Sequence, residues 1–144
     1  MLEITIPGVE LYDERTNEFI YYDDETIQLE HSLVSISKWE ANWCKPFLHG
    51  KDKTSEEILD YIKCMTITDG VSDDLYSRLT PENYSMINDY IGRPMTATTF
   101  SGDNNKTNRE IITSEIIYYW MVSFNIPFEC QYWHLNRLLT LVRV

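Results

Sequence analysis

The sequence predicts an α+β fold in which an N-terminal β-hairpin unit precedes a bundle of five or six helices. Residues 1–30 contain short segments in which polar and apolar residues alternate, which is typical of strands. From Ser32 onward, apolar residues instead recur at steps of three and four, and Ser or Thr residues stand at helix-start positions. A chain of 144 residues is expected to form one domain over 1–144, with a hairpin region at 1–30 and a helical region at 31–144.

The hairpin is predicted from two strand segments that flank a polar, turn-prone stretch. These segments are residues 10–12 and 19–22, and the stretch between them is Asp13-Glu14-Arg15-Thr16-Asn17. Residues 3–6 form an alternating strand that ends at Pro7-Gly8, and residues 26–29 form a possible further strand. Two or three strands need a cover on their apolar face, which we expect from the helices.

Helix starts are indicated by capping residues and helix ends by proline or glycine. Thr54 and Glu57 fit a capping box, and Thr80-Pro81 places a cap before an N1 proline. The expected helices run from Ser32 to before Pro46, from Thr54 through Met65, over 73–79, from Thr80 to Gly92, over 111–124 and over 128–142.

The segment before the fifth expected helix is polar and rich in turn residues. We predict a connector over 95–107, in which residues 101–106 are the best candidate for a mobile loop. Thr107 and Glu110 offer another capping box. The helix over 111–124 is the most hydrophobic one and its apolar residues cover more than one face, so we expect it to be central in the bundle.

The composition favours a folded, acidic protein and disfavours two classes of partner. Hydrophobic residues make up 43% of the chain, and the formal net charge is −11. Residues 1–79 carry 17 acids and 7 bases, so the front half repels phosphate backbones and anionic lipid. We therefore expect neither nucleic acid nor membrane as a partner. The acids form either a solvated surface, a binding surface for a basic partner or a mimic of nucleic-acid charge.

The residue types that carry catalysis or hold metal ions do not form a recognisable pattern. His31, His49 and His134 are scattered, and no pair has a metal-ligand spacing on one helix. The five glycines are isolated, so no phosphate-binding loop is expected. Glu115 is the one carboxylate expected to be buried, and pairing with Arg109, Arg137 or a tyrosine explains it better than catalysis. We predict no enzyme, no cofactor and no metal site.

Aromatic runs near the carboxyl end predict a partner-binding surface. Adjacent residues on a helix project to different sides, so the runs 118–120 and 132–133 do not all fit one core stripe. They either fill a large core between two helices or form an apolar groove for a partner helix. The apolar residues 138–142 are likewise either docked in the core or exposed to a partner. The candidate partner-binding residues are Tyr118, Tyr119, Trp120, Tyr132, Trp133, Leu138 and Leu141.

Several blocks of the sequence resemble tail assembly chaperones of long-tailed bacteriophages. The blocks are EHSLVSISKWE at 30–40, KPFL at 45–48, KTSEE at 53–57, REIITSEIIYYWM at 109–121, IPFEC at 126–130 and WHLNRLLTL at 133–141. The resemblance covers roughly residues 30–66 and 108–142, about half of the chain, and leaves out residues 1–29 and 95–107.

This resemblance implies a binding role without catalytic residues. Such chaperones bind the tape measure protein, a long helical rod, keep it soluble in the host cell cytoplasm while the tail forms, and are typically absent from the mature virion. Some also exist in a longer, frameshifted form. Self-association is a further expectation. Two alternatives stay open: a structural virion component, such as a head–tail connector or baseplate protein, and an acidic inhibitor of a host nucleic-acid-binding defence protein.

Overall fold

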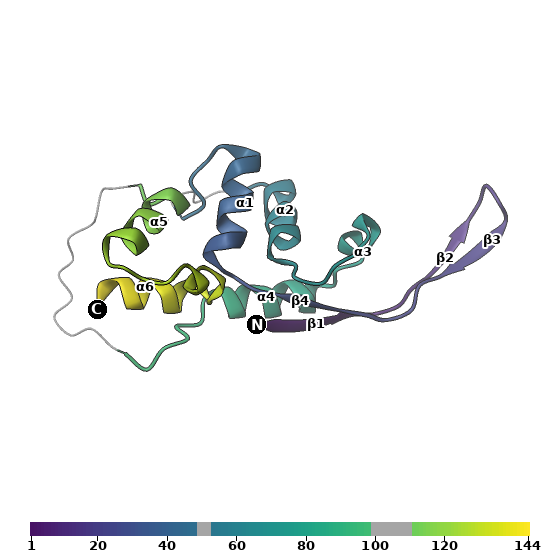
Figure 1. The fold of residues 1–144 in the computed structure, drawn as a ribbon. Helices are drawn as coiled ribbons and strands as arrows, with labels where there is room; N and C mark the ends of the chain where they lie inside the picture. Colours follow the sequence, from purple (N-terminus) through teal and green to yellow (C-terminus); the bar gives the residue numbers. More distant parts are fainter. Residues whose placement is uncertain (49–52, 99–110) are drawn as a thin grey trace.

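The computed structural model describes residues 1–48, 53–98 and 111–144 and confirms the α+β fold (Figure 1). The predicted loop at 101–106 and the capping box at Thr107 lie outside the described residues. The strands are β1 (Leu2–Ile6), β2 (Glu10–Asp13), β3 (Glu18–Tyr21) and β4 (Glu25–Leu29). The helices are α1 (Leu33–Trp43), α2 (Ser55–Met65), α3 (Asp73–Ser77), α4 (Pro81–Ile91), α5 (Ser114–Ser123), the 3-10 helix η1 (Phe128–Tyr132) and α6 (Leu135–Arg143).

The four strands form one long hairpin that is interrupted midway. β1 pairs with β4 and β2 pairs with β3, in both cases antiparallel. The first ladder ends at the pair Ile6–Glu25, and the same register continued outward leads to Glu10 opposite Tyr21, the first pair of the second ladder. The interruption therefore takes the same number of residues from each strand, and the polar segment after Asp13 closes the hairpin as predicted.

The two halves of this hairpin have different surroundings. In the inner ladder, Ile4, Ile6, Ile27 and Leu29 are at most 2% exposed, because β1 lies beside α4 and β4 beside the end of α2. In the outer ladder, every residue of β3 is exposed. Figure 1 shows β2 and β3 projecting away from the helices as an arm. We use the name arm for residues 8–24.

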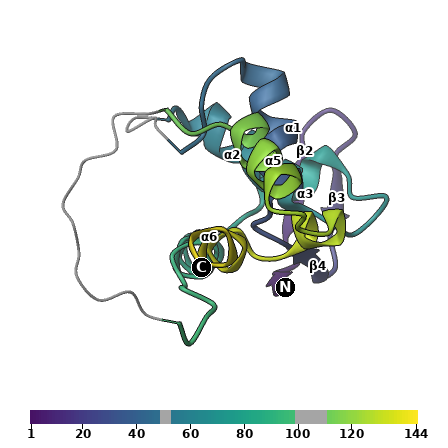
Figure 2. The ribbon, with the colours of Figure 1, turned by 60° about the vertical axis from the view of Figure 1, so that its left-hand side comes forward.

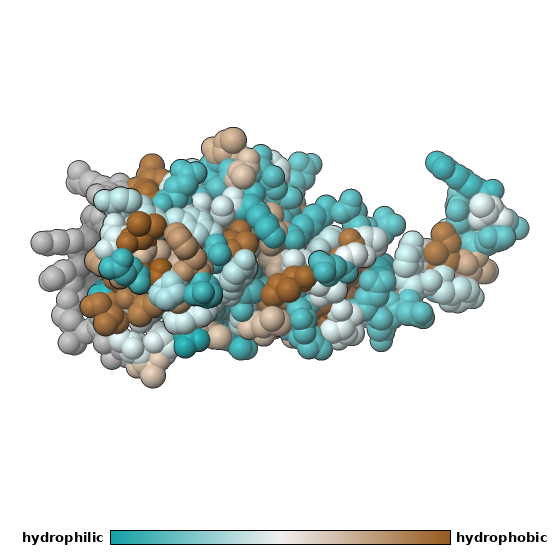
Figure 3. All heavy atoms as spheres, in the orientation of Figure 1, coloured by the Kyte–Doolittle hydropathy of each residue, from teal (hydrophilic) through white to brown (hydrophobic). Residues whose placement is uncertain are grey.

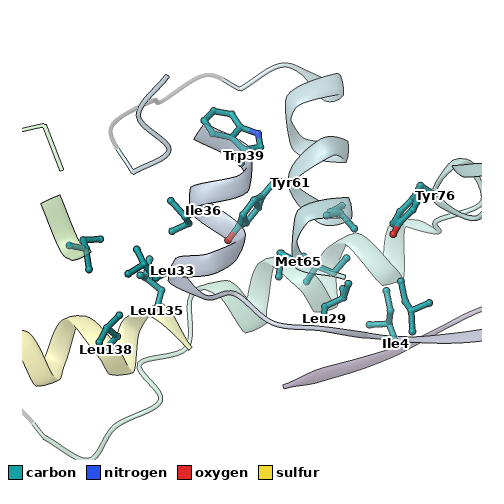
Figure 4. Packing of buried hydrophobic residues seen from close by; sticks show 14 of the residues in the cluster. Ile4, Leu29, Leu33, Ile36, Trp39, Tyr61, Met65, Tyr76, Leu135 and Leu138 are labelled. Carbon is teal, nitrogen blue, oxygen red and sulfur yellow. The ribbon is translucent and has the colours of Figure 1, made fainter. Parts of the chain in front are cut away.

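The core joins the inner ladder to α1, α2, α5 and α6. Figure 4 shows Leu33 and Ile36 of α1 beside Leu135 and Leu138 of α6, while Leu29 lies below Met65. All of these side chains are at most 1% exposed. The caps predicted from Thr54 and Thr80 are present: each hydroxyl accepts a hydrogen bond from a backbone N–H three residues later. The capping box predicted for Thr54 and Glu57 forms only in this half, and the Glu57 carboxylate accepts instead from Lys45 Nζ at 3.0 Å. Figure 1 shows α5 and α6 at the end of the molecule that lies away from the arm, and in Figure 2 this end is turned toward the viewer.

Two helix predictions need correction. The expected helix over 111–124 begins only at Ser114, because the Thr113 hydroxyl caps it by accepting from the N–H of Ile116. The expected helix over 128–142 is divided into η1 and α6, because Trp133 has an extended backbone, with φ −70° and ψ 159°. His134 then forms a β-bridge with Ser32, which sets the start of α6.

The predicted places of one side chain and of one helix in the bundle are also wrong. Glu115 is exposed and not buried. α5 is not central, since Ile117 and Met121 face the core at 0% exposed while Tyr119 and Val122 are 68% and 60% exposed. The high hydrophobicity of this helix therefore reflects a second apolar face that is open to solvent.

Candidate partner-binding surface

The first candidate surface begins on the outer side of α5. Tyr119 and Val122 are three positions apart, so they share one face of the helix, and both are more than half exposed. The opposite face, with Ile117 and Met121, is fixed against the core. The helix position itself is held by Glu40 of α1, whose carboxylate accepts from the N–H of Ser114 at 2.8 Å. The exposed residues are thus presented on a helix that is anchored at its start.

The 3-10 helix η1 extends this surface. The hydroxyl of Tyr118 donates to the side-chain oxygen of Gln131 at 2.8 Å, which holds η1 beside α5. Burial raises the pKa of Tyr118, and nearby Tyr132 adds to the increase. Phe128 and Tyr132 at the two ends of η1 are 56% and 63% exposed. The N–H of Ile126 donates a hydrogen bond of 2.8 Å to the C=O of Met121, which closes the turn between α5 and η1.

We call the resulting set the α5–η1 surface, made of Tyr119, Val122, Phe124, Phe128 and Tyr132. Phe124, which caps α5, is 60% exposed. Figure 3 shows apolar residues gathered at the end of the molecule that carries α5 and α6. Apolar side chains that gather on a surface in this way are typical of binding sites for other proteins.

The structure separates the residues predicted from the aromatic runs into three groups. Tyr119, Tyr132 and Leu141 are exposed. Tyr118, Trp120 and Trp133 are half-buried against the core, and the guanidinium of Arg137 lies 4.2 Å from the centre of the Trp133 ring. Leu138 is 0% exposed, so a partner does not reach it in the folded chain. Sequence reasoning missed Val122, Phe124 and Phe128, although their apolar character next to the two runs was a usable signal.

A second exposed apolar surface lies on the arm. Tyr12 and Phe19 are cross-strand partners with ring centres 5.2 Å apart, and Tyr21 lies on the same face, two positions from Phe19. These three rings, the aromatic face of the arm, are 51%, 57% and 71% exposed. The Tyr12 hydroxyl donates to the side-chain oxygen of Asn17, whose positive φ of 56° allows the tight turn.

The base of the arm is held by contacts to the body. Gly8 is required there, because a Cβ at this position would lie 2.1 Å from the carbonyl oxygen of Tyr22 on the opposite strand. Arg78, after α3, places its guanidinium 4.6 Å from the centre of the Tyr22 ring and 3.6 Å from Glu25. The side chain of Arg78 is only 7% exposed. The arm therefore leaves the body at a defined, packed junction.

A hollow of about 460 Å³ lies between α2 and α4. Its lining is mainly apolar, and Ile58 is the most exposed apolar residue in it at 42%. Lys53 borders the hollow, with its ammonium 4.4 Å from the centre of the Phe47 ring. Burial lowers the pKa of Lys53, while Glu57 opposes that change. The polar residues of the lining are Lys53, Ser55 and Asn88.

Histidines that are far apart in the sequence meet in the core. His31 Nδ1 lies 2.5 Å from the Tyr61 hydroxyl, which lies 3.0 Å from the Ser35 hydroxyl. The rings of His31 and His134 are 5.2 Å apart and nearly perpendicular. Burial, followed by the charge of His134, lowers the pKa of His31 to about 3. With His31 and His134 at 2% and 3% exposed, the cluster fastens α1, α2 and α6 together and is closed to a substrate.

The remaining candidate chemical groups are dispersed. Among residues 1–48, 53–98 and 111–144, no three His, Cys, Asp or Glu side chains are grouped so that they could hold a metal ion. Cys130 is buried, Cys64 is half-buried and Cys44 is exposed, and His49 lies outside the described ranges. Burial raises the pKa of Cys64 to about 11, which disfavours a reactive thiolate. No helix in the described part of the chain has the length and apolar character needed to cross a membrane.

No family model, no curated protein and no solved structure matches this chain.

Proposed function

We propose that the protein is an assembly chaperone that covers apolar helical segments of a partner, and that this partner is the tape measure protein of a tailed phage. The observation that carries the chaperone role is the α5–η1 surface, which stays exposed although the opposite face of α5, with Ile117 and Met121, is packed on the core. The choice of partner rests on the sequence resemblance described above. In this proposal the protein acts in the host cytoplasm and leaves before the virion is mature.

The surface has the properties that binding an amphipathic helix requires. Tyrosine and phenylalanine offer large contact areas with few rotatable bonds, so little side-chain entropy is lost on binding. Burying one half-exposed apolar side chain contributes on the order of 1 kcal/mol. Five such side chains lie on this surface. Because α5 and η1 are already anchored, the surface does not need to be ordered first.

The acidic exterior supports the second half of the role. A tape measure rod exposes long apolar stretches before assembly, and such stretches aggregate. A cover with a formal net charge of −11 keeps a complex soluble through mutual repulsion of the covered particles. The aromatic surface supplies affinity in this proposal, and the charge supplies solubility.

Co-expression with the tape measure protein of the same phage tests the proposal. We expect the tape measure protein to be soluble only when this chain is present. The double variant Tyr119→Ser and Phe128→Ser should lose this effect, because it removes two exposed rings from the α5–η1 surface without opening the core. Met86→Ser with Ile67→Ser is the matched control, since these side chains are each 45% exposed and lie elsewhere. An equally soluble tape measure protein without the chain would disprove the proposal.

A structural virion component is the second candidate function, and the projecting arm favours it. Extended arms allow subunits of an assembly to contact their neighbours at a distance from their own core. Mass spectrometry of purified particles, together with a pull-down from infected cells, separates the two functions. Presence in the pull-down with absence from particles is the chaperone result, whereas a fixed copy number per particle is the virion-component result.

A further inference from the structure

The arm combines exposed aromatic side chains with a high density of acidic residues. Its aromatic face, Tyr12, Phe19 and Tyr21, is more than half exposed at every position. Residues 8–24 contain six acids and one base, a net charge of −5. An isolated two-stranded hairpin is marginally stable in water, and it gains stability when its apolar face is covered.

The aromatic face is the continuation of the buried face of the inner ladder. Side chains two positions apart point to the same side of a strand, and the register is unchanged across the interruption. Tyr12 is therefore in phase with Ile4 and Ile6, and Phe19 and Tyr21 are in phase with Ile27 and Leu29. The inner side chains are covered by helices of the same chain, whereas the outer ones extend past the end of the body (Figure 1).

The opposite end of the molecule combines exposed apolar residues with a basic α6 segment. Residues 130–144 contain no acid and carry Arg137 and Arg143, a net charge of +2, while Glu115 on α5 and Glu129 on η1 bring residues 114–144 as a whole to a net charge of 0. Leu141 and Val144 on this segment are 38% and 83% exposed, and the α5–η1 surface lies beside it. Figure 3 places this apolar end away from the arm, so the two surfaces of one chain do not meet.

We propose that the arm docks on the α5–α6 end of a second copy of this chain. The aromatic face packs on the exposed apolar residues of that end, and the arm acids lie near Arg137 and Arg143. Charge selects this arrangement over arm-to-arm pairing, which would bring together two segments of net charge −5. Docked reciprocally by two antiparallel copies, the contact gives a dimer, and docked head to tail it gives a chain.

The size of the arm predicts that this contact is weak. Stable interfaces bury about 800 Å² on each partner, and three partly exposed rings with their neighbours supply less than that. Self-association is therefore expected to depend on concentration and on salt. Because the arm would use the α5–η1 surface, a partner helix bound to that surface would displace it. The contact between two copies of the chain does not depend on the proposed tape measure partner.

Sedimentation equilibrium of the full chain, from about 1 μM to about 500 μM, tests the contact. We expect the average mass to rise with concentration above that of the monomer. The variant Phe19→Ser with Tyr21→Ser should weaken association at least about tenfold, because it removes two rings from the contact. The control Met86→Ser with Ile67→Ser removes comparably exposed apolar groups elsewhere and should leave association unchanged.

A charge exchange identifies the two surfaces directly. Glu14→Lys with Glu18→Lys on the arm, and Arg137→Glu with Arg143→Glu on α6, should each weaken association. The four changes together should restore it, because the arm and the α6 segment then attract again with reversed signs. Glu3→Lys with Asp89→Lys is the matched control, at exposed positions outside both surfaces. Combined with Arg137→Glu and Arg143→Glu, this control pair should not restore association.

Circular dichroism of each variant checks that the fold is kept. A sample that stays monomeric at every concentration overturns the proposal, and so does association that survives loss of the arm rings. Charge variants that weaken association without mutual rescue also overturn the assignment of the two surfaces. These outcomes are independent of the co-expression result, so the failure of one proposal can be told from the failure of the other.

Discussion

In the inner ladder of the hairpin, Ile4 and Leu29 are at most 1% exposed, and in the outer ladder Phe19 and Tyr21, on the continuation of the same face, are more than half exposed. Both ladders are antiparallel, share one register and alternate in the same way. The difference is that β1 packs beside α4, whereas the arm lies beyond the helices of the body. An alternating pattern therefore specifies which side chains share a face, while distant parts of the chain decide whether that face is buried.

The largest expected effect comes from matched isoleucine truncations in the two ladders. Ile6→Ala should lower the free energy of unfolding by about 2–5 kcal/mol, because Ile6 is 0% exposed and its loss leaves a cavity. Ile20→Ala on the arm, where the side chain is 39% exposed, should cost less than about 0.5 kcal/mol. Urea unfolding of both variants measures the difference. Equal losses would show that the arm is as firmly packed as the inner ladder.

A smaller effect is expected at the junction between the ladders. Gly8→Ala places a Cβ 2.1 Å from the Tyr22 carbonyl oxygen, so the two strands must move apart at this level. We expect a cost of about 1–3 kcal/mol in the same unfolding experiment. Gly92→Ala is the control, because its Cβ would meet Asn88 O at an ordinary 3.7 Å. If Gly8→Ala were as well tolerated as the control, the junction would not be the packed joint described above.

The third effect is a loss of stability in acid that arises in the body and not in the arm. The pKa of His31 is about 3 in the folded chain and about 6.5 when unfolded, so below pH 6.5 only the unfolded state takes up the proton. This contribution is complete above about pH 6.5 and is lost as the pH falls toward 3. Between pH 7 and pH 5 the loss amounts to about 2 kcal/mol.

The variant His31→Gln separates this effect from the titration of other groups. It should flatten the dependence of the unfolding free energy on pH between 7 and 5, even though removal of the bond to Tyr61 lowers stability overall. Arm variants such as Phe19→Ser should retain the full dependence. A wild-type chain that is equally stable at pH 7 and pH 5 would contradict the expectation.

Local signals in the sequence were sufficient for most of the elements. The hairpin around residues 13–17 and the helix starts at Thr54 and Thr80 could be predicted, because turn residues and caps act on backbone groups within a few positions. The break at Trp133 could not, because it depends on the bridge between His134 and Ser32. That bridge joins segments about a hundred residues apart, and no local pattern reports it.

The candidate site could be predicted only in part, for the same reason. Adjacent aromatic residues required some rings to point away from one core stripe, and Tyr119 and Tyr132 do so. Which ring of each run would do so depends on where α1 and η1 lie against α5, and Leu138 is in the core because α6 turns it toward Leu33. The phase relation between the arm and the inner ladder needed the pairing register, which the sequence alone did not supply.

Because the interruption takes the same number of residues from each strand, the length of the arm sets how far its tip lies from the body. At about 3.3 Å per residue, the stretch from Ile6 to Asp13 holds its tip roughly 20 Å beyond the last pair of the inner ladder. Deleting two residues from each strand would shorten this reach by about 7 Å and leave the rings on the same side. Deleting one residue from each strand would shorten the reach by half that distance and would move the aromatic rings to the opposite side of the arm. The number of deleted residues therefore sets the reach, and whether that number is odd or even sets the side on which the rings lie.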